Sequence, residues 1–420
     1  MANKPKIRFK GFDDAWEQRK LGDVVERVTR KNQDLVSQLP LTISAQYGLI
    51  DQNMFFDKRV ASKDVSGYYL IYNGEFAYNK STSSDAPWGA IKRLDRYENG
   101  VLSTLYIVFK IKNEKVINSD FLVTYYDTCN WHKDIKAVAA EGARNHGLLN
   151  IAPADFFKTE LMLPQDIEEQ KKIGSYFKLI DHLITLHQRK CDQMKELKKY
   201  MLTKMFPQNG AKVPEIRFDG FIDDWEQRKL LSCIQSITDF RGRTPKKLGM
   251  DWSESGYLAL SALNVKDGYI DFSQDVHYGN QELYDKWMSG KELHRGQVLF
   301  TTEAPMGNVA QVPDNKGYIL SQRTIAFDVE EKILSENFLA TLLRTPNVFN
   351  DLIALSSGGT AKGVSQKSLS GLDVVIPKNI DEQNKLADYF INLDNLITLH
   401  QHKCNELREI KKYMLKNMFI

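Results

Sequence analysis

Residues 163–206 read LPQDIEEQKKIGSYFKLIDHLITLHQRKCDQMKELKKYMLTKMF, and residues 376–419 repeat this stretch as IPKNIDEQNKLADYFINLDNLITLHQHKCNELREIKKYMLKNMF. A shorter stretch, IRFKGFDDAWEQRKL at 7–21, returns at 216–230 as IRFDGFIDDWEQRKL. The long pair is offset by 213 residues and the short pair by 209. The sequence therefore predicts two copies of one unit, with similar borders and different middles.

The long repeat predicts one long helix in each copy. No proline interrupts 167–206, and apolar residues recur there every seven positions. Asp166 with Glu169, and Asn379 with Glu382, have the spacing of a capping box. At about 1.5 Å per residue each helix would be roughly 60 Å long.

Each helix alone would expose an apolar stripe, so we expect the two to pair as an antiparallel coiled coil that separates the other parts of the chain. The residues expected at its core are Ile173, Phe177, Ile180, Ile184 and Met194 in the first helix, and Leu386, Phe390, Leu393, Ile397 and Leu407 in the second.

The divergent middles predict two globular α/β domains, so the expected fold class is α+β with a pseudo-two-fold internal repeat. Short β-rich runs, such as 106–111 and 297–300, alternate with Gly, Asn and Pro turns. We expect a first domain over 1–162, a first spacer helix over 163–208, a second domain over 209–375 and a second helix over 376–420. The repeat is cyclic in character, so the two termini are expected to be close in space.

Composition narrows the function classes. The chain has 420 residues, with 57 Lys and Arg against 54 Asp and Glu, a net charge of +3. A DNA-mimicking inhibitor would be strongly acidic, and any nucleic-acid surface must be local. We expect no membrane span and no secretory signal. The four cysteines form no CxxC pair, which fits reduced thiols and a cytoplasmic location.

Sequence motifs for catalysis are missing. No dinucleotide-binding, P-loop, GxSxG or HExxH motif occurs, and neither does the Asn/Asp-Pro-Pro-aromatic signature of amino-methyltransferases. Glu196-Leu197-Lys198 and Glu409-Ile410-Lys411 match the ExK of some nucleases, but we expect both on a solvated helix face. His187 with Cys191, and His400 with Cys404, could bind zinc as a set of four. We favour ordinary core packing for them and predict no metal site.

Polar clusters on the predicted loops suggest contacts with DNA, because Arg and Lys bind guanine edges and phosphates while Asn and Gln read adenine. Similar clusters occur at matching places in both middles. The candidates are Lys80, Ser81, Thr82, Ser84, Lys92, Arg93, Arg144 and Asn145 in the first domain, and Arg241, Arg243, Thr244, Lys246, Lys247, Thr301, Thr302, Gln322, Arg323, Thr360, Lys362, Gln366 and Lys367 in the second.

The chain resembles the DNA-specificity subunit of Type I restriction–modification enzymes over essentially its whole length. The resemblance rests on the FxxxWEQRKL segment at 12–21 and 221–230, on the P-x-x-I-x-E-Q helix start at 164–170 and 377–383, and on the order of domains and helices. It implies two target recognition domains that each bind one half of a split DNA site, with the helices as a spacer ruler.

The resemblance also implies partners for this non-catalytic chain. These are double-stranded DNA, two modification (methyltransferase) subunits that methylate adenine with S-adenosylmethionine, and restriction subunits that use ATP and Mg²⁺ for translocation and cleavage. Since the two middles differ, we expect an asymmetric bipartite site. Three alternatives stay open: a nuclease or methyltransferase in its own right, the specificity subunit of a related combined restriction–methylation system, and a non-catalytic coiled-coil interaction scaffold.

Overall fold

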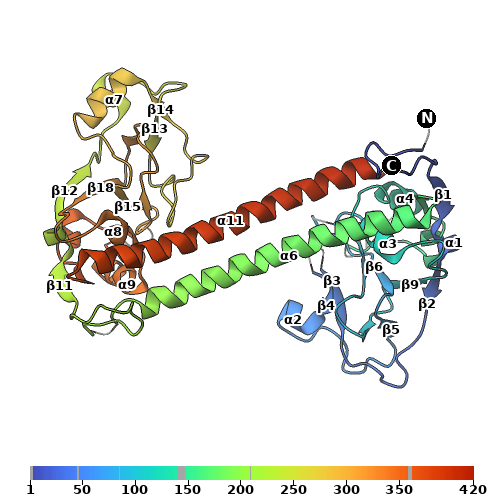
Figure 1. Ribbon diagram of the computed structural model, residues 1–420. Helices are drawn as coiled ribbons and strands as arrows, with labels where there is room; N and C mark the ends of the chain where they lie inside the picture. Colours follow the sequence, from blue (N-terminus) through green and yellow to red (C-terminus); the bar gives the residue numbers. More distant parts are fainter. Residues whose placement is uncertain (1–2, 45–46, 85, 140–146, 209, 358–361) are drawn as a thin grey trace. The chain divides into compact units, whose positions relative to one another are not determined.

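The computed structural model (Figure 1) describes the chain except for residues 1–2, 45–46, 85, 140–146, 209 and 358–361. It forms two compact units. The first unit comprises Met1–His187 and His402–Ile420, and the second comprises Gln188–Gln401. Each unit therefore joins one globular domain to parts of both long helices.

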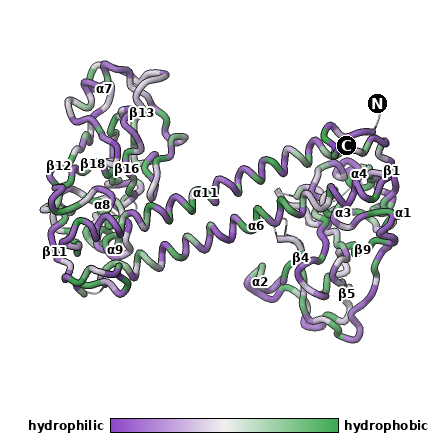
Figure 2. Tube along the Cα trace, in the orientation of Figure 1, coloured by the Kyte–Doolittle hydropathy of each residue, from purple (hydrophilic) through white to green (hydrophobic). Residues whose placement is uncertain are grey.

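The two long helices are α6 (Ile167–Lys204) and α11 (Ile380–Met418), as predicted. Polar and apolar residues alternate along both (Figure 2), in keeping with the seven-residue period. In the first unit, the thiol of Cys404 on α11 lies 3.5 Å from the carbonyl oxygen of Ile184 on α6. In the second unit, Cys191 on α6 lies 3.9 Å from the carbonyl oxygen of Ile397 on α11. Residue numbers rise along one helix as they fall along the other, so the expected antiparallel pairing is confirmed.

The first domain consists of short strands and helices. Their order is β1 (Glu17–Lys20), α1 (Leu21–Val24), β2 (Val25–Val28), β3 (Leu41–Ser44), β4 (Gly48–Asp51), α2 (Gln52–Phe56), β5 (Tyr69–Tyr72), β6 (Phe76–Asn79), β7 (Ala90–Arg93), β8 (Asn99–Leu102), β9 (Ile107–Ile111), α3 (Ser119–Tyr126), α4 (His132–Val138), α5 (Pro153–Phe156) and β10 (Glu160–Leu163). The strand expected at 106–111 is β9, which confirms that β-rich run.

The second domain follows a related order. It contains β11 (Glu226–Lys229), the 3₁₀ turn η1 (Leu230–Cys233), β12 (Ile234–Asp239), the 3₁₀ turn η2 (Pro245–Leu248), β13 (Tyr257–Leu260), β14 (Tyr278–Gly279), α7 (Gln281–Met288), β15 (Val298–Thr301), β16 (Val309–Gln311), β17 (Ile319–Leu320), β18 (Thr324–Val329), α8 (Glu336–Leu342), α9 (Pro346–Leu355), α10 (Gln366–Leu369) and β19 (Asp373–Ile376). Residues 298–300 of the run expected at 297–300 lie in β15.

Each domain contains a four-stranded antiparallel sheet, and the two sheets have the same strand arrangement. Their order is β2-β9-β6-β7 in the first domain and β12-β18-β15-β16 in the second. Alternate residues of the central strands face two different cores, as the two-residue period of a strand requires. Phe76 and Tyr78 face the core that contains α6, whereas Ala77 faces a smaller core. Each domain also has an equivalent two-stranded antiparallel sheet, β1-β10 in the first and β11-β19 in the second. The other sheets differ, with β3-β4 and β5-β8 in the first domain and β14-β13-β17 in the second.

The two repeated motifs lock together at the start of each long helix. Arg8 binds the carboxylate of Glu169 through two bonds of 2.6 and 2.8 Å, and Arg217 binds Glu382 at 2.7 and 2.9 Å. Both glutamates are buried. The expected capping box is therefore wrong in its second half: Asp166 does cap the helix, accepting from the backbone N–H of Glu168, but the glutamate turns inward to an arginine. A local motif cannot reveal a partner 161 residues away.

The buried glutamines next to these glutamates tie each helix to its domain. Gln170 accepts from the backbone N–H of Asn118 at 2.9 Å and donates to the carbonyl oxygens of Val116 and Pro164. Gln383 makes the equivalent bonds to Ser335, Ile333 and Pro377 in the second unit. Each helix therefore starts from the same network of buried hydrogen bonds.

The end of α11 lies against the N-terminal segment, as the cyclic repeat predicts. The backbone N–H of Ile7 donates to the carbonyl oxygen of Asn417 at 3.0 Å, and the rings of Trp16 and Phe419 meet edge to face at 5.8 Å. In the second unit, Phe206 and Trp225 meet at 5.9 Å in the same geometry. The same joint between the end of a long helix and the short repeat thus occurs twice. In the second unit the two segments follow each other in the chain, and in the first unit they come from opposite ends of the sequence.

The lysines of the ExK sequences do not lie on a solvated face, so that expectation is wrong. Lys198 pairs with Asp394 at 2.6 Å, and Lys411 pairs with both Asp127 and Asp181 at 2.7 to 2.8 Å. The side chains of Lys198 and Lys411 are only 12% and 18% exposed. Both lysines therefore join the paired helices through partly buried ion pairs.

Metal-binding clusters and membrane-spanning helices are both absent from the described residues. Within the described ranges of the chain, no cluster of three or more His, Cys, Asp or Glu side chains could hold a metal ion. None of the helices in that part of the chain is long and apolar enough to cross a bilayer.

Candidate nucleic-acid interface

A basic turn follows β12 in the second domain and carries five of the predicted residues. Thr244 caps the short turn η2 by accepting from the backbone N–H of Lys247 at 3.3 Å. The ammonium group of Lys247 donates to the carbonyl oxygen of Gly242, and Arg241 donates to Thr302 at 3.3 Å. These bonds hold the turn in one conformation, while the Lys246 side chain stays exposed.

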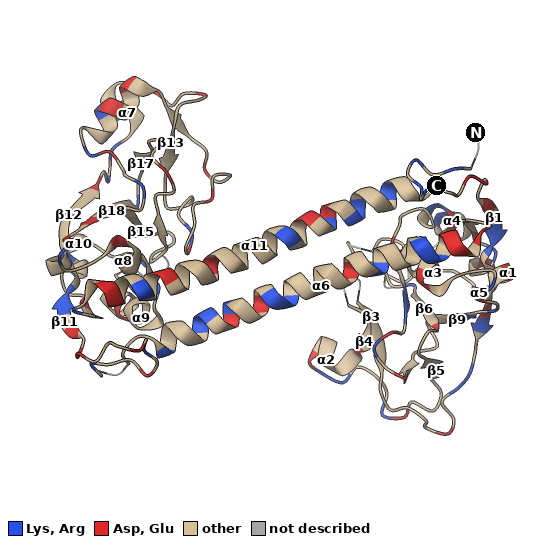
Figure 3. Cartoon of the chain, viewed as in Figure 1, with Lys and Arg blue, Asp and Glu red and all other residues tan. Residues whose placement is uncertain are grey.

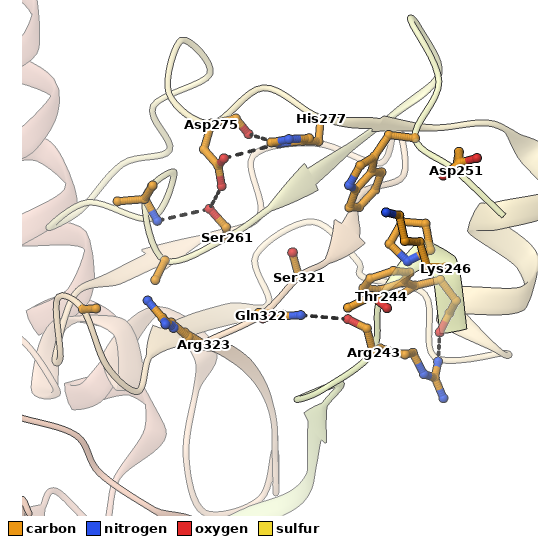
Figure 4. A pocket seen from close by; sticks show the side chains of 16 residues that line it. Arg243, Thr244, Lys246, Asp251, Ser261, Asp275, His277, Ser321, Gln322 and Arg323 are labelled. Carbon is orange, nitrogen blue, oxygen red and sulfur yellow. Dashed lines mark hydrogen bonds and ion pairs between the residues drawn. The ribbon is translucent and has the colours of Figure 1, made fainter. Parts of the chain in front are cut away.

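This turn forms one wall of a cavity of about 460 Å³ in the second domain (Figure 4). Five predicted residues line it: Arg243, Thr244, Lys246, Gln322 and Arg323. They come from two loops far apart in the sequence, one after β12 and the other between β17 and β18. Gln322 joins the two loops by donating its amide N–H to the carbonyl oxygen of Arg243 at 3.0 Å.

The two arginines of this cavity are held differently. The Arg243 guanidinium stacks over the Phe240 ring at 4.2 Å and donates to the carbonyl oxygen of Trp287. Arg323 pairs with Glu303 at 3.2 Å and keeps 54% of its side chain exposed. Its backbone φ is +64°, a conformation that few non-glycine residues adopt. Of the two, Arg323 is the more available to a ligand.

The same cavity contains a hydrogen-bonded group that sequence reasoning missed. The Ser261 hydroxyl donates to Asp275 at 2.6 Å, and the Asp275 carboxylate lies 3.3 Å from Nδ1 of His277. The His277 ring lies 5.4 Å from that of Trp252. The sequence repeats Ser44-Ala45 as Ser261-Ala262. That repeat does not indicate which carboxylate Ser261 would meet.

Thr301 and Thr302 are not exposed loop groups, so that expectation is corrected. Both side chains are buried, at 0% and 1% exposure. The Thr301 hydroxyl accepts from the backbone N–H of Asn308 at 2.9 Å, and the Thr302 hydroxyl donates to the carbonyl oxygen of Arg323. They shape the neighbouring loops instead of facing outward.

The remaining candidates of the second domain lie on or near α10. Gln366 donates to Asp239 at 3.3 Å, which connects α10 to the end of β12. Lys362 and Lys367 are exposed. Thr360 lies outside the described residues.

In the first domain, the candidates after β6 are partly committed to the fold. Lys80 donates to the carbonyl oxygen of Ile151 at 3.4 Å, and its partial burial lowers the pKa of its ammonium group. Thr82 donates to the carbonyl oxygen of Gly147 at 3.0 Å. Ser81 and Ser84 are exposed. Arg144 and Asn145 lie outside the described residues.

Lys92 and Arg93 on β7 belong to ion-pair networks. Lys92 binds Asp127 at 2.7 Å. Arg93 binds Asp95 at 2.6 Å and Asp120 at 2.8 Å. The Arg93 side chain is 12% exposed, so its main contribution is to hold β7 against α3.

The residues expected at the helix core mostly lie in the interior of the units. Seven of the ten are buried: Ile173, Phe177, Ile180, Leu386, Phe390, Leu393 and Leu407. Ile184, Met194 and Ile397 are half-buried. Ile173 and Phe177 belong to the domain core, and so do Leu386 and Phe390 in the second unit. The first turns of each helix are therefore part of a domain as well as of the helix pair.

Comparisons with known proteins agree with this architecture. A family model described as the Type I restriction modification DNA specificity domain matches residues 13–196 and again residues 222–409. No curated protein matches the chain. The crystal structure of the Type-I restriction-modification system S subunit from M. genitalium has a TM-score of 0.62 at 11% identity and covers 99% of each chain. The HsdS subunit from Thermoanaerobacter tengcongensis gives a TM-score of 0.44 at 17% identity over 97% of each chain.

The two family matches fall on the two copies of the repeat and together span most of the chain. The likeness to the M. genitalium S subunit extends over the whole length and concerns the fold. The chain belongs to the family of Type I restriction–modification DNA specificity subunits and carries two target recognition domains.

Proposed function

We propose that this chain is the sequence-specific DNA-binding subunit of a Type I restriction–modification complex and recognises an asymmetric bipartite site. The observation that carries the proposal is the contrast within the repeat. Each domain has a four-stranded sheet of the same strand order and the same joint to a long helix, but the loops differ, and so do the sheets β3-β4 and β5-β8 from β14-β13-β17. Two domains with different loops would read two different half-sites.

The loop chemistry of the second domain suits the reading of base edges. Its cavity gathers Arg323, Gln322 and Lys246, whose side chains donate hydrogen bonds, beside the carboxylate of Asp275. Arginine and lysine pair with guanine, glutamine with adenine, and a carboxylate accepts from cytosine. In this proposal the cavity faces one half-site, and the exposed lysines of the turn hold the phosphates beside it.

The helix pair would act as the spacer between the two half-sites. Each helix is attached to its domain by a buried ion pair and a buried glutamine, so a domain cannot easily turn at its helix start. The partly buried lysine–aspartate pairs hold the helices in one register. A rigid attachment and a fixed register are what a molecular ruler needs.

Catalysis is assigned to partner subunits. Modification subunits carrying S-adenosylmethionine would methylate adenine in the recognised site, and restriction subunits using ATP and Mg²⁺ would translocate and cut DNA. The residues of this chain would contribute recognition and spacing alone.

Single-molecule sequencing of N6-methyladenine in cells that express this chain with its modification subunits tests the proposal. Methylation at one split motif with two different half-sites is expected, and it should disappear when this chain is omitted. In a second arm, Gln322→Ala with Arg323→Ala should relax or weaken one half-site, by about 1 to 3 kcal/mol for each bidentate base pairing that is removed.

A matched control is Lys316→Ala, because Lys316 is 82% exposed and pairs with Asp314 on the surface of the same domain. It should leave both half-sites unchanged. Methylation that does not depend on this chain, with the partners expressed, would contradict the proposed function.

A further inference from the structure

A large groove lies wholly within the first unit, between the globular domain and α11. Its volume is about 900 Å³. The domain side is formed by Tyr47–Leu49, by the end of β7 and by the end of α3. The helix side is formed by one face of α11 and by Asp181, Ile184 and Thr185 of α6. Its lining contains seven basic side chains against three acidic ones: Lys92, Arg93, Arg96, Arg408, Lys411, Lys412 and Lys416, with Asp95, Asp127 and Asp181.

The acidic side chains of the groove are already engaged. Asp127 binds both Lys92 and Lys411, Asp181 binds Lys411, and Asp95 binds Arg93. Among the described residues, no acidic side chain lies within ion-pair distance of Arg96, Lys412 or Lys416, and all three are exposed. The groove therefore keeps an excess of positive charge that the unit itself does not neutralise.

The basic residues of α11 form a row. Arg408, Lys412 and Lys416 are spaced four residues apart, which places them on one helix face about 6 Å from one another along the axis. Figure 3 shows the basic residues along this end of α11. A row of flexible cations beside an open groove suits an extended polyanion better than a single small anion.

The second unit repeats this arrangement only in part, although its helices are nearly identical in sequence. Counted along the repeat, Lys92 and Arg96 are replaced by Ala310 and Asp314, and Lys416 by Thr203. Arg408 and Lys412 are matched by lysines, Lys195 and Lys199. The segment FLVTYYDTCN at 121–130 aligns with FLATLLRTPN at 338–347, so Arg344 stands where the first unit has Asp127.

Arg344 fills the corresponding place in the second unit. Its guanidinium binds Asp267 and Asp394, and it packs so closely on Gly268 that a Cβ there would lie 2.6 Å from Nη2. The first unit therefore carries basic residues, Lys92, Arg96 and Lys416, at positions where the second unit has none. The repeated helices alone do not account for this difference in charge, because it comes mainly from the domains.

From this asymmetry we infer that the groove binds the phosphate backbone of duplex DNA beside the half-site read by the first domain. The inference rests on the proposed function and adds a binding surface outside the recognition loops. Lysine and arginine that neutralise phosphates release counterions, so the groove supplies affinity that depends on salt and not on base sequence. The second unit has Asp314 and Thr203 in place of Arg96 and Lys416, so the two units would hold the backbone with different residues.

The test uses the full chain purified with its modification subunits, and measures its binding to labelled cognate and non-cognate duplexes by anisotropy over a range of salt concentrations. The groove variant is Arg96→Gln, Lys412→Gln and Lys416→Gln together. Its plot of log affinity against log salt should become shallower by about 0.9 for each phosphate that is no longer neutralised, for both duplexes. The methylated motif should stay the same.

The matched control is Lys195→Gln with Lys199→Gln. These two exposed α6 residues lie in the second unit and occupy the positions that Arg408 and Lys412 have in the first. It should leave the salt dependence unchanged. A groove variant with an unchanged slope, or a control with an equal change, would overturn the inference. The inference would also be overturned if the groove variant no longer bound its modification subunits but kept the slope of log affinity against log salt. The groove would then bind an acidic surface of a partner protein.

Failure of the proposed function gives a different result. If the wild-type complex shows no preference for a duplex carrying its methylated motif, both the function and the groove assignment are overturned. If the wild type has that preference and the groove variant matches its slope, the groove assignment alone is overturned.

Discussion

The two joints between domain and helix carry the same motifs but are not equally satisfied. In the second unit, Trp225 donates its indole N–H to Glu382 at 3.1 Å, and Arg217 also reaches the carbonyl oxygen of Asp223. In the first unit, within the described residues, Nε1 of Trp16 and Nη1 of Arg8 are buried without a hydrogen-bond partner. The ion pair is the same in both units, whereas the hydrogen bonds around it differ.

The ion pairs farther along the helices differ in the same way. The helix residues are unchanged, since Asp181 and Lys411 correspond to Asp394 and Lys198. The residue that the domain adds to this group is Asp127 in the first unit and Arg344 in the second, so its charge is opposite. The helix residues of this group are therefore the same in both units, while each domain contributes a residue of different charge.

The largest effect is expected from shortening the shared helices. Deleting residues 185–191 and 398–404 removes one heptad from each helix at corresponding positions, between the lysine–aspartate pairs of the two units. The helix pair would shorten by about 10.5 Å, close to three base pairs of duplex at roughly 3.4 Å each. Methylome sequencing should show both half-sites unchanged and the gap reduced by about three base pairs.

A deletion in one helix alone is the control for this variant. It breaks the antiparallel register and should abolish methylation at the split motif instead of moving it. An unchanged gap in the double-deletion variant would mean that the helices do not set the spacing.

Removing the arginine at each joint should lower the free energy of unfolding by different amounts in the two units. Arg8→Met leaves the buried Glu169 without a charged partner, which typically costs about 3 to 5 kcal/mol. Arg217→Met should cost less, because Glu382 keeps the hydrogen bond from Trp225. Urea unfolding of the full chain, followed by tryptophan fluorescence, measures both.

Arg19→Met is the control for these variants, since the Arg19–Glu17 pair is exposed at 39% and 30% and should contribute less than about 1 kcal/mol. Equal losses for Arg8→Met and Arg217→Met would show that the indole bond has no energetic weight.

A smaller effect is expected where α3 crosses α6. A Cβ at Gly174 would lie 2.7 Å from the backbone nitrogen of Phe121 and 2.8 Å from the carbonyl carbon of Asp120. Ala387 takes this position in the second unit and is fully buried there. Gly174→Ala gains up to about 1 kcal/mol of helix propensity but loses about 1 to 3 to overpacking, so a net loss is expected.

Ala387→Gly is the reverse test, and it should also destabilise, by about 1 kcal/mol or more. Thermal unfolding of both variants gives the comparison. A stabilised Gly174→Ala variant would show that the first domain can move away from its helix at no cost.

The sequence was sufficient to predict what depends on local pattern. The long helices followed from a heptad repeat free of proline, and their antiparallel pairing from the position of the second domain between them. It did not predict the inward turn of Glu169, the burial of Lys198 and Thr302, or the meeting of Ser261 with Asp275. Each of these depends on a contact between segments distant in sequence, for which the local pattern carries no signal.

The smallest effect concerns the two equivalent lysines and alkaline pH. Burial would lower the pKa of Lys411, but the carboxylates of Asp127 and Asp181 outweigh it and raise that pKa. Burial, together with the nearby Arg344 guanidinium, lowers the pKa of Lys198. Lys411 therefore contributes stability that is complete below the ordinary lysine value of about 10.4 and is lost as pH rises through its raised pKa.

Lys198 has the opposite dependence, because the unfolded chain holds the proton more tightly than the folded one. Its contribution rises as pH increases from its lowered pKa towards about 10.4. Urea unfolding at several pH values between about 8 and 11 should therefore show the wild-type advantage over Lys411→Gln shrinking, while stability relative to Lys198→Gln grows. Two parallel curves would mean that burial and the charge of Arg344 do not lower the pKa of Lys198, and that the two ion-pair groups respond to pH in the same way.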